Sequence, residues 1–340
     1  MEKKEHLGRT TSREIMRITI TVFLFIFLWA CKDVPENKAP VAEDDIRAKR
    51  AIPAFDAARA YANVEEQLNF GFRVPGTEAH QNQINWLVKT MEGYGAKVLQ
   101  QSFKADFLGQ KDVNCTNVMA QINPDKTDRV LLAAHFDSRM IAEKDDERQD
   151  QPIAGADDGA SGVAVLLEVA KTISERGIDI GVDFLFFDAE DQGDSDKAET
   201  WALGSQYWSK NLAPKDYSAK FGILLDMVGS KNAAFGKEEY SVRFAPEYVN
   251  KIWTLAQNMG YGDFFQNFVT GRVTDDHLYV NMNAKIPMVD IINISPEDRQ
   301  SFGDYHHTHD DNIEIISKRT LRVVGQVVLA VLYNESNRTF

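Results

Sequence analysis

The sequence predicts an α/β fold, a single domain with a mixed, mostly parallel central β-sheet and helices on both faces. Three predominantly apolar runs, at residues 129–135, 182–187 and 221–225, are typical of strands buried on both faces of a sheet. The segment between the first two runs has apolar residues at helical spacing. A strand, a helix and a strand in this order imply a parallel crossover. No internal repeat or interior linker follows, so we expect one domain over residues 56–340.

The other elements follow from the same patterns. Apolar residues at intervals of three and four predict helices at residues 57–68, 79–93, 163–173, 204–212, 246–259 and 317–333. Shorter apolar segments predict further strands at residues 97–103, 115–122 and 286–292. We expect the first two of these strands to pair antiparallel at an edge of the sheet.

The composition excludes two broad classes of protein. Apolar residues make up 44% of the 340 residues, with 20 Phe and 10 Tyr, which is too many for a disordered chain. The formal net charge of −13 argues against a nucleic-acid partner, because such a partner requires a basic face. We therefore expect a folded protein that does not bind nucleic acid.

The first 31 residues predict an export signal. A basic segment precedes an apolar run at residues 18–30, which is too short to span a membrane comfortably and favours a secretory signal over a transmembrane anchor. Residues 28–31, LWAC, resemble a bacterial lipobox, in which Cys31 would carry the lipid. Trp29 departs from the small residue usual at that position, so simple cleavage and an uncleaved anchor remain alternatives.

Residues 32–55 are charged and contain proline, which predicts a tether between membrane and domain. Cys115 is the only cysteine besides Cys31, so we expect no internal disulfide in the mature chain. The expected location is the periplasm or the outer membrane, with membrane contact only through an N-terminal lipid anchor.

Side chains that can bind a metal follow the predicted central strands. They are His135, Asp137, Asp158, Glu190, Asp191, Asp226 and the segment HHTHDDN at residues 306–312. Ligands of open α/β sheets bind at the carboxyl ends of the strands, so we expect these side chains to meet. A single His after a strand is more often a structural residue of the core than a metal ligand. Acids placed at random, however, would fall at the amino ends of the strands as often as at the carboxyl ends. Here metal-binding side chains occur at five strand ends. Because imidazole and carboxylates suit Zn²⁺, this pattern predicts a zinc site.

Glu190 and Asp191 stand side by side after the most apolar of these strands. Two adjacent acids can divide the chemistry of a site. One can hold a metal while its neighbour takes a proton from the substrate and returns it.

Five motifs resemble, in order and in spacing, those of the zinc aminopeptidase and glutaminyl cyclase superfamily. They are HFDS (135–138), GADDGASG (155–162), DAED (188–191), LLDMVG (224–229) and HTHDDN (307–312). The resemblance implies a zinc enzyme with a mixed α/β sheet. It implies zinc ligands at Asp158, Asp191 and His307, and a general acid/base at Glu190. In this superfamily the peptide bond after the corresponding Asp is often cis, so the resemblance also implies a cis bond after Asp158.

The superfamily uses these positions in two ways, and the motifs alone leave both open. In di-zinc aminopeptidases, His135 and Asp226 would hold a second zinc, and Asp158 would bridge the two metals. In glutaminyl cyclases, one zinc is bound. Asp226 would then join a hydrogen-bond network with Glu190 and with Asp275 of the segment VTDDH.

Three details favour the cyclase. Asp191 stands where the aminopeptidases usually have Glu, and VTDDH (273–277) resembles the cyclase segment. DAEDQGD followed by WALGSQYW (201–208) resembles the bacterial, mammalian-type glutaminyl cyclases, in which Trp201 would line the substrate pocket. A core aromatic is the structural alternative for Trp201.

The resemblance therefore implies a glutaminyl-peptide cyclotransferase with one Zn²⁺ per chain. Such an enzyme converts the N-terminal Gln of peptides or proteins to pyroglutamate and releases ammonia. The alternative enzyme is a di-zinc exported aminopeptidase. A third hypothesis, a binding module that keeps the fold without the activity, would predict a broken ligand set, and no member of the set is missing here.

Overall fold

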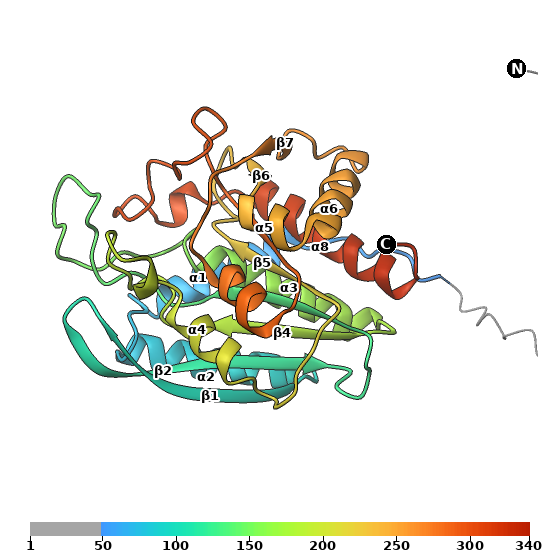
Figure 1. Ribbon diagram of the computed structural model, residues 1–340, viewed down its shortest axis with the longest axis horizontal. Coiled ribbons are helices and arrows are strands. Elements are labelled where there is room, and N and C mark those ends of the chain that lie inside the picture. The colour runs from blue at the N-terminus through green and yellow to red at the C-terminus, as the bar shows by residue number, and fades with distance from the viewer. Residues whose placement is uncertain (1–48) are drawn as a thin grey trace, which may run out of the picture. The chain divides into compact units, whose positions relative to one another are not determined.

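The computed structural model describes residues 49–340, which form one α/β unit around a six-stranded sheet (Figure 1). The strands of this sheet are β1 (Lys97–Phe107), β2 (Gln110–Ile122), β3 (Arg129–His135), β4 (Gly181–Phe187), β5 (Phe221–Asp226) and β8 (Met288–Ile292). They lie in the order β1-β2-β4-β3-β5-β8. The predicted fold class is confirmed.

Four strands of the sheet are parallel, since β3 runs parallel to β4 and to β5, and β5 runs parallel to β8. The crossover from β3 to β4 contains α3 (Ala160–Arg176), as the strand–helix–strand pattern predicted. Strands β1 and β2 form the expected antiparallel pair. However, β2 also pairs with β4 from Val118 to Ile122, so it is an interior strand and not an edge strand. Its last five residues are buried, as a position between two neighbours requires.

Helices cover both faces of the sheet. The first face packs against α1 (Ala57–Asn69), α2 (Glu78–Gly93), α3, α6 (Pro246–Asn258) and α8 (Lys318–Ser336). The second face packs against α4 (Leu203–Lys210) and the π-helical turn Val280–Ala284. Side chains of β3 alternate between the two cores: Val130, Leu132 and Ala134 point to the first, and Leu131 and Ala133 to the second.

The elements missed by sequence reasoning are short. They are β6 (Phe235–Lys237), β7 (Phe265–Val269), α5 (Glu239–Phe244), α7 (Asp276–Tyr279), the π-helical turn Val280–Ala284 and the 3₁₀ turns Ala198–Thr200 and Ile313–Ile315. Segments of three to six residues complete fewer than two helical turns, or at most two or three strand alternations, so they show no clear period.

The folded unit begins before residue 56. The backbone N–H of Arg50 donates to Asn337 Oδ1 (2.9 Å), and its guanidinium pairs with Asp179 (3.2 Å). Phe55 is buried against Gly325 of α8, where an added Cβ would lie 2.2 Å from its ring. The end of the segment expected to be a tether thus packs on the domain.

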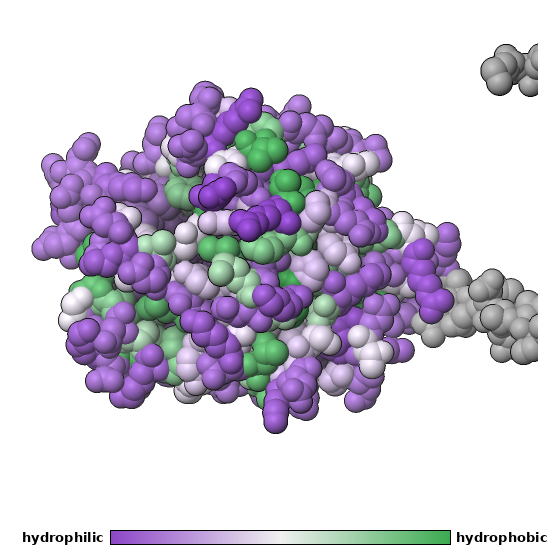
Figure 2. Space-filling view, in the orientation of Figure 1, coloured by the Kyte–Doolittle hydropathy of each residue, from purple (hydrophilic) through white to green (hydrophobic). Residues whose placement is uncertain are grey.

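The expected signal and Cys31 lie outside the described residues. Between Lys49 and Phe340, no helix combines the length and hydropathy that a membrane span requires. On the face shown in Figure 2, hydrophilic residues predominate and hydrophobic residues form scattered groups.

Candidate active site

One pocket at the carboxyl ends of the parallel strands collects the predicted carboxylates. It is lined by Asp158, Glu190, Asp191, Met227, Asp226, Val273, Thr274, Asp275, Ile292, Phe302 and His306. The acids in this set come from four separate stretches of the sequence. The sheet topology brings them together, because β3, β4, β5 and β8 all end at this edge.

Two of the proposed ligands lie against a histidine. His307 Nε2 is 3.0 Å from Asp191 Oδ1 and 3.8 Å from Asp158 Oδ2. Asp191 Oδ2 is buried and has no hydrogen-bond partner among the described residues. An imidazole nitrogen, two carboxylates and an unpartnered buried oxygen fit a Zn²⁺ ion. The arrangement matches the chemistry of the predicted ligand set.

His306 is a further candidate ligand; sequence reasoning placed it in the metal-binding segment HHTHDDN but assigned the ligand role to His307 alone. Its Nε2 lies 3.9 Å from Asp158 Oδ2, and it forms with Asp158 and His307 a group whose donor atoms lie within 4.8 Å of one another. The signal was present in the sequence as two adjacent histidines in HHTHDDN. Burial lowers the pKa of His306 well below its ordinary value, which keeps the ring neutral and its lone pair available.

His135 lies between two acids. Its Nε2 is 3.0 Å from Asp158 Oδ1 and 3.3 Å from Asp226 Oδ1, and these three residues form a second group of candidate metal donors. The structure thus also brings together the residues that a second metal would require.

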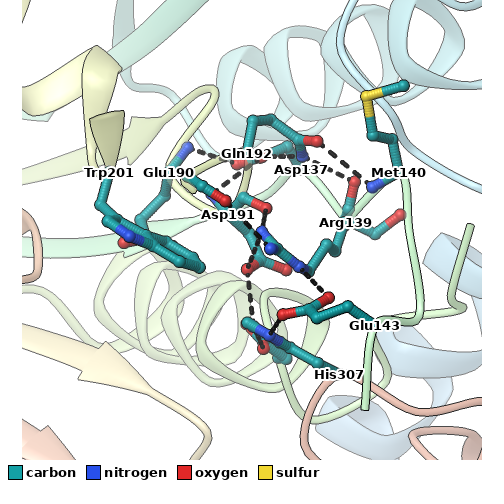
Figure 3. A network of polar contacts seen from close by, with 12 residues as sticks. Asp137, Arg139, Met140, Glu143, Glu190, Asp191, Gln192, Trp201 and His307 are labelled. Carbon is teal, nitrogen blue, oxygen red and sulfur yellow. Dashed lines mark hydrogen bonds and ion pairs between the residues drawn. The ribbon is translucent and has the colours of Figure 1, made fainter. Parts of the chain in front are cut away.

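Asp137 fixes the turn that carries the adjacent acids (Figure 3). Its carboxylate accepts the backbone N–H groups of Glu190 (3.0 Å) and Asp191 (3.2 Å) and the side-chain amide of Gln192 (2.8 Å). The end of β3 therefore holds the end of β4 in place. Asp137 acts on the site by positioning these neighbours.

Three residues at the site have left-handed backbone conformations that are uncommon for residues other than glycine. They are Ala189 (φ 53°), just before Glu190, Met227 (φ 48°), just after Asp226, and His307 itself (φ 60°). Such conformations cost about 1 kcal/mol or more and persist where the surrounding structure holds them. The backbone is thus strained where it presents the polar side chains.

The loop of Asp158 is held by the segment that carries His307. Asp311 accepts the backbone N–H groups of Asp157 (2.7 Å) and Asp158 (3.1 Å). Gly159 has a φ of 99°, and an added Cβ would lie 2.6 Å from the carbonyl oxygen of Asp137, so the position requires glycine. The expectation of a cis bond after Asp158 is wrong, because the cis peptide among the described residues is Ala213–Pro214.

Burial, together with neighbouring charges, raises the pKa values of three carboxyls in the pocket. Burial, with Asp275, Asp276 and Asp191 nearby, raises the pKa of Glu190 well above its ordinary value, although His135 opposes the shift. Burial likewise raises the pKa of Asp275. For Asp226, burial and then Asp275 raise the pKa to about 7 against the hydrogen bond of His135. Groups shifted in this way can hold a proton near neutral pH.

A buried network behind Asp275 was also missed. His277 Nε2 lies 2.9 Å from Glu238 Oε2, and its Nδ1 lies 3.6 Å from Asp290 Oδ2 and 4.0 Å from Asp275 Oδ2. The sequence did contain a signal for this network, since Asp290 is an acid within the otherwise apolar strand β8.

Trp201 lies beside His307 and is not among the residues that line the pocket. Its indole stacks on the imidazole, with ring centroids 5.7 Å apart and planes inclined by 11°. The guanidinium of Arg139 lies 4.7 Å from the indole centroid. Arg139 also pairs with Glu143 (2.7 Å), which in turn contacts His307 Nδ1 at 2.6 Å (Figure 3). Sequence reasoning missed Arg139 and Glu143, because they belong to a polar stretch without periodicity.

Comparison with known proteins places this site in a family. The model of peptidase family M28 matches residues 117–332, more than half of the chain. Aminopeptidase YwaD of Bacillus subtilis (strain 168) is 27% identical over 232 residues, which cover 67% of this chain and 45% of YwaD. The glutaminyl-peptide cyclotransferase of Bos taurus is 25% identical over 251 residues, which cover 63% of this chain and 64% of the bovine protein. The chain thus spans about half to two thirds of the length of these curated relatives.

Solved structures match over almost their whole length. Tannerella forsythia glutaminyl cyclase is 46% identical, with a TM-score of 0.81, and the match covers 83% of this chain and 99% of that one. A Zn-dependent exopeptidase from Parabacteroides distasonis is 43% identical, with a TM-score of 0.81, over 84% of this chain and 100% of that one. The matched region runs from within β2 to within α8 and contains every residue that lines the pocket, and the chain belongs to peptidase family M28.

Proposed function

We propose that this chain is a zinc-dependent glutaminyl-peptide cyclotransferase, which closes the N-terminal Gln of peptides or proteins into pyroglutamate and releases ammonia. The observation that carries the proposal is the position of Asp275, which lines the same pocket as Glu190 and Asp226. The identity of 46% to the cyclase of Tannerella forsythia supports it.

Asp158, Asp191 and His307 would hold one zinc ion. The bound ion would supply Lewis-acid polarisation of the γ-carbonyl of the substrate Gln. No water nucleophile is required, because the attacking group is the α-amine of the substrate itself. Since a free α-amine in a peptide has a pKa of about 7.7–8.0, this amine is partly neutral at physiological pH.

Glu190 would move the proton. Its carboxylate lines the pocket, and its raised pKa lets it accept a proton from the α-amine and return it to the departing nitrogen. Asp226 and Asp275 would share protons with Glu190, since three buried carboxyls in one pocket cannot all be ionised without cost.

The apolar part of the pocket lining is suited to an uncharged side chain. Met227, Val273, Ile292 and Phe302 line it with apolar surface. A neutral Gln side chain can enter such a pocket without the desolvation penalty of a charged one. Trp201, beside His307, would border the substrate as it enters.

A di-zinc aminopeptidase is the second candidate, and one observation favours it. His135 and Asp226 lie around Asp158 as a second metal would require. In the cyclase, the same His135 instead donates a hydrogen bond to Asp226 and holds it beside the pocket.

The two activities are separated by incubating the purified chain with Gln-initiated and Leu-initiated peptides. We expect ammonia and pyroglutamyl peptide from the first and no free amino acid from the second. Release of leucine without ammonia would reject the cyclase.

We further propose that residues 1–31 direct export and that Cys31 carries a lipid. Membrane fractionation of wild type and Cys31→Ser tests this proposal, and identical partitioning would reject the lipid anchor.

A further inference from the structure

We propose that Glu143 sets the zinc affinity of this site by orienting His307, and that Arg139 holds Glu143 in place. The inference rests on the proposed function in taking His307 as a zinc ligand. Both residues belong to the stretch Arg139 to Asp145, here called the bridging segment, which follows β3. Neither residue belongs to the motifs of the site.

The contact with Glu143 determines which nitrogen of His307 carries a proton. Glu143 Oε1 lies 2.6 Å from His307 Nδ1, on the side of the ring away from Asp191 and Asp158. A carboxylate only accepts hydrogen bonds, so Nδ1 must donate. In the neutral ring, the lone pair is then on Nε2, the nitrogen that faces the two proposed carboxylate ligands. A carboxylate in this position also makes the imidazole a stronger ligand.

Arg139 connects Glu143 to the loop of the other ligand. Its Nε lies 2.7 Å from Glu143 Oε2, while its two terminal nitrogens donate to the backbone carbonyls of Asp191 (2.7 Å) and Gly193 (2.9 Å). The guanidinium is almost fully buried, with 1% of the side chain exposed. Figure 3 shows Arg139 between Glu143 and the backbone after Asp191.

The bridging segment also holds the backbone around His307. The N–H of Lys144 donates to the carbonyl of His307 (3.3 Å), and Asp145 accepts the N–H of His309 (2.7 Å). Both the ring and the main chain of the histidine are therefore fixed by one segment. This segment joins the two loops that supply Asp191 and His307.

The test compares zinc affinities of the full chain by competition with a chromogenic chelator. Removal of a group that hydrogen-bonds a metal-binding histidine typically lowers the metal affinity about 10–100-fold, so Glu143→Ala should weaken zinc binding by about that factor. Glu143→Gln keeps an acceptor without the charge and should fall between wild type and Glu143→Ala. Glu147→Ala is the matched control, because Glu147 is exposed, four residues further along. It should bind zinc as wild type does.

A merely structural role predicts a different result. In that case Glu143→Ala would lower the melting temperature of the zinc-free chain and leave its zinc affinity unchanged, which would overturn the proposal. Equal losses in Glu143→Ala and Glu147→Ala, or a wild-type chain that binds no zinc, would overturn it as well. Weakened zinc binding in Glu143→Ala, in a chain that fails to cyclise Gln peptides, would uphold this inference and reject the proposed function.

Discussion

His135 Nε2 lies 3.3 Å from Asp226 Oδ1, across the parallel pair β3 and β5. In a mononuclear cyclase, this contact is a hydrogen bond and not half of a second metal site. We therefore expect one tightly bound zinc per chain, and we expect His135→Ala to keep it. Elemental analysis of the dialysed proteins measures this count. Two zinc ions in wild type and one in His135→Ala would favour the aminopeptidase.

Glu190→Gln should lose the chemical step and keep the metal. The amide has the size of the acid but cannot accept a proton. We expect kcat to fall by about two to four orders of magnitude, the usual contribution of a positioned general base. Zinc content and substrate binding should be unchanged, as measured by elemental analysis and calorimetry. Loss of zinc from this variant would contradict the role assigned to Glu190.

Asp191→Asn should behave in the opposite way. A neutral amide is a poorer zinc ligand than a carboxylate, so zinc affinity should fall. Added zinc should restore part of its activity and should have no effect on Glu190→Gln. Full-strength zinc binding by Asp191→Asn would show that Asp191 is not a ligand.

Trp201 can be displaced without being removed. An added Cβ at Gly193 would lie 2.0 Å from the indole, so Gly193→Ala must shift the ring from its present position beside His307. If the indole borders the substrate, both Gly193→Ala and Trp201→Ala raise KM for Gln peptides several-fold while zinc content stays at one. An unchanged KM in both variants would leave Trp201 with a packing role only.

Stability should depend on a buried ion pair far from the pocket. Asp183 is fully buried and pairs with Arg129 Nε at 2.7 Å. Asp183→Asn leaves a buried guanidinium without its counter-charge, which costs about 3–5 kcal/mol in the free energy of unfolding. Urea denaturation measures the loss. Asp106→Asn breaks the exposed pair with Lys111 (2.9 Å) and should change stability little, so equal effects would contradict the expectation.

The stability of the zinc-free chain should depend on pH through Asp226. The pKa of this group is raised from 3.8 to about 7 by burial and by Asp275, so the folded state binds its proton more tightly than the unfolded state does. The group therefore destabilises the folded chain increasingly as pH rises from about 4 to 7. Asp226→Asn removes this effect, and its unfolding temperature relative to wild type should rise between pH 5 and pH 8. A constant difference would contradict the assignment.

The sequence was sufficient for the centre of the fold and for the acids of the pocket. Continuous apolar runs leave few alternatives to buried parallel strands, and the carboxyl ends of such strands must share an edge. Asp158, Glu190, Asp191, Asp226 and Asp275 could therefore be assigned to one pocket from sequence patterns and the resemblance they carry.

The contacts between loops could not be predicted in this way. Glu143 and His307 are 164 residues apart, and neither lies in an element with a period that would indicate a partner. The pairing of Glu238 with His277 has the same origin, since it joins the start of α5 to α7. Such pairs depend on how loops fold over the sheet, which local sequence patterns do not record.

The proposed ligands come from three loops that are far apart in the sequence, and this has a consequence for folding. A chain that has not closed its sheet cannot bring Asp158, Asp191 and His307 together. Zinc would then bind the native state in preference to the unfolded chain, and each tenfold excess over the dissociation constant adds about 1.4 kcal/mol to native stability. The lifetime of the protein against proteases would then follow the free zinc concentration of its surroundings.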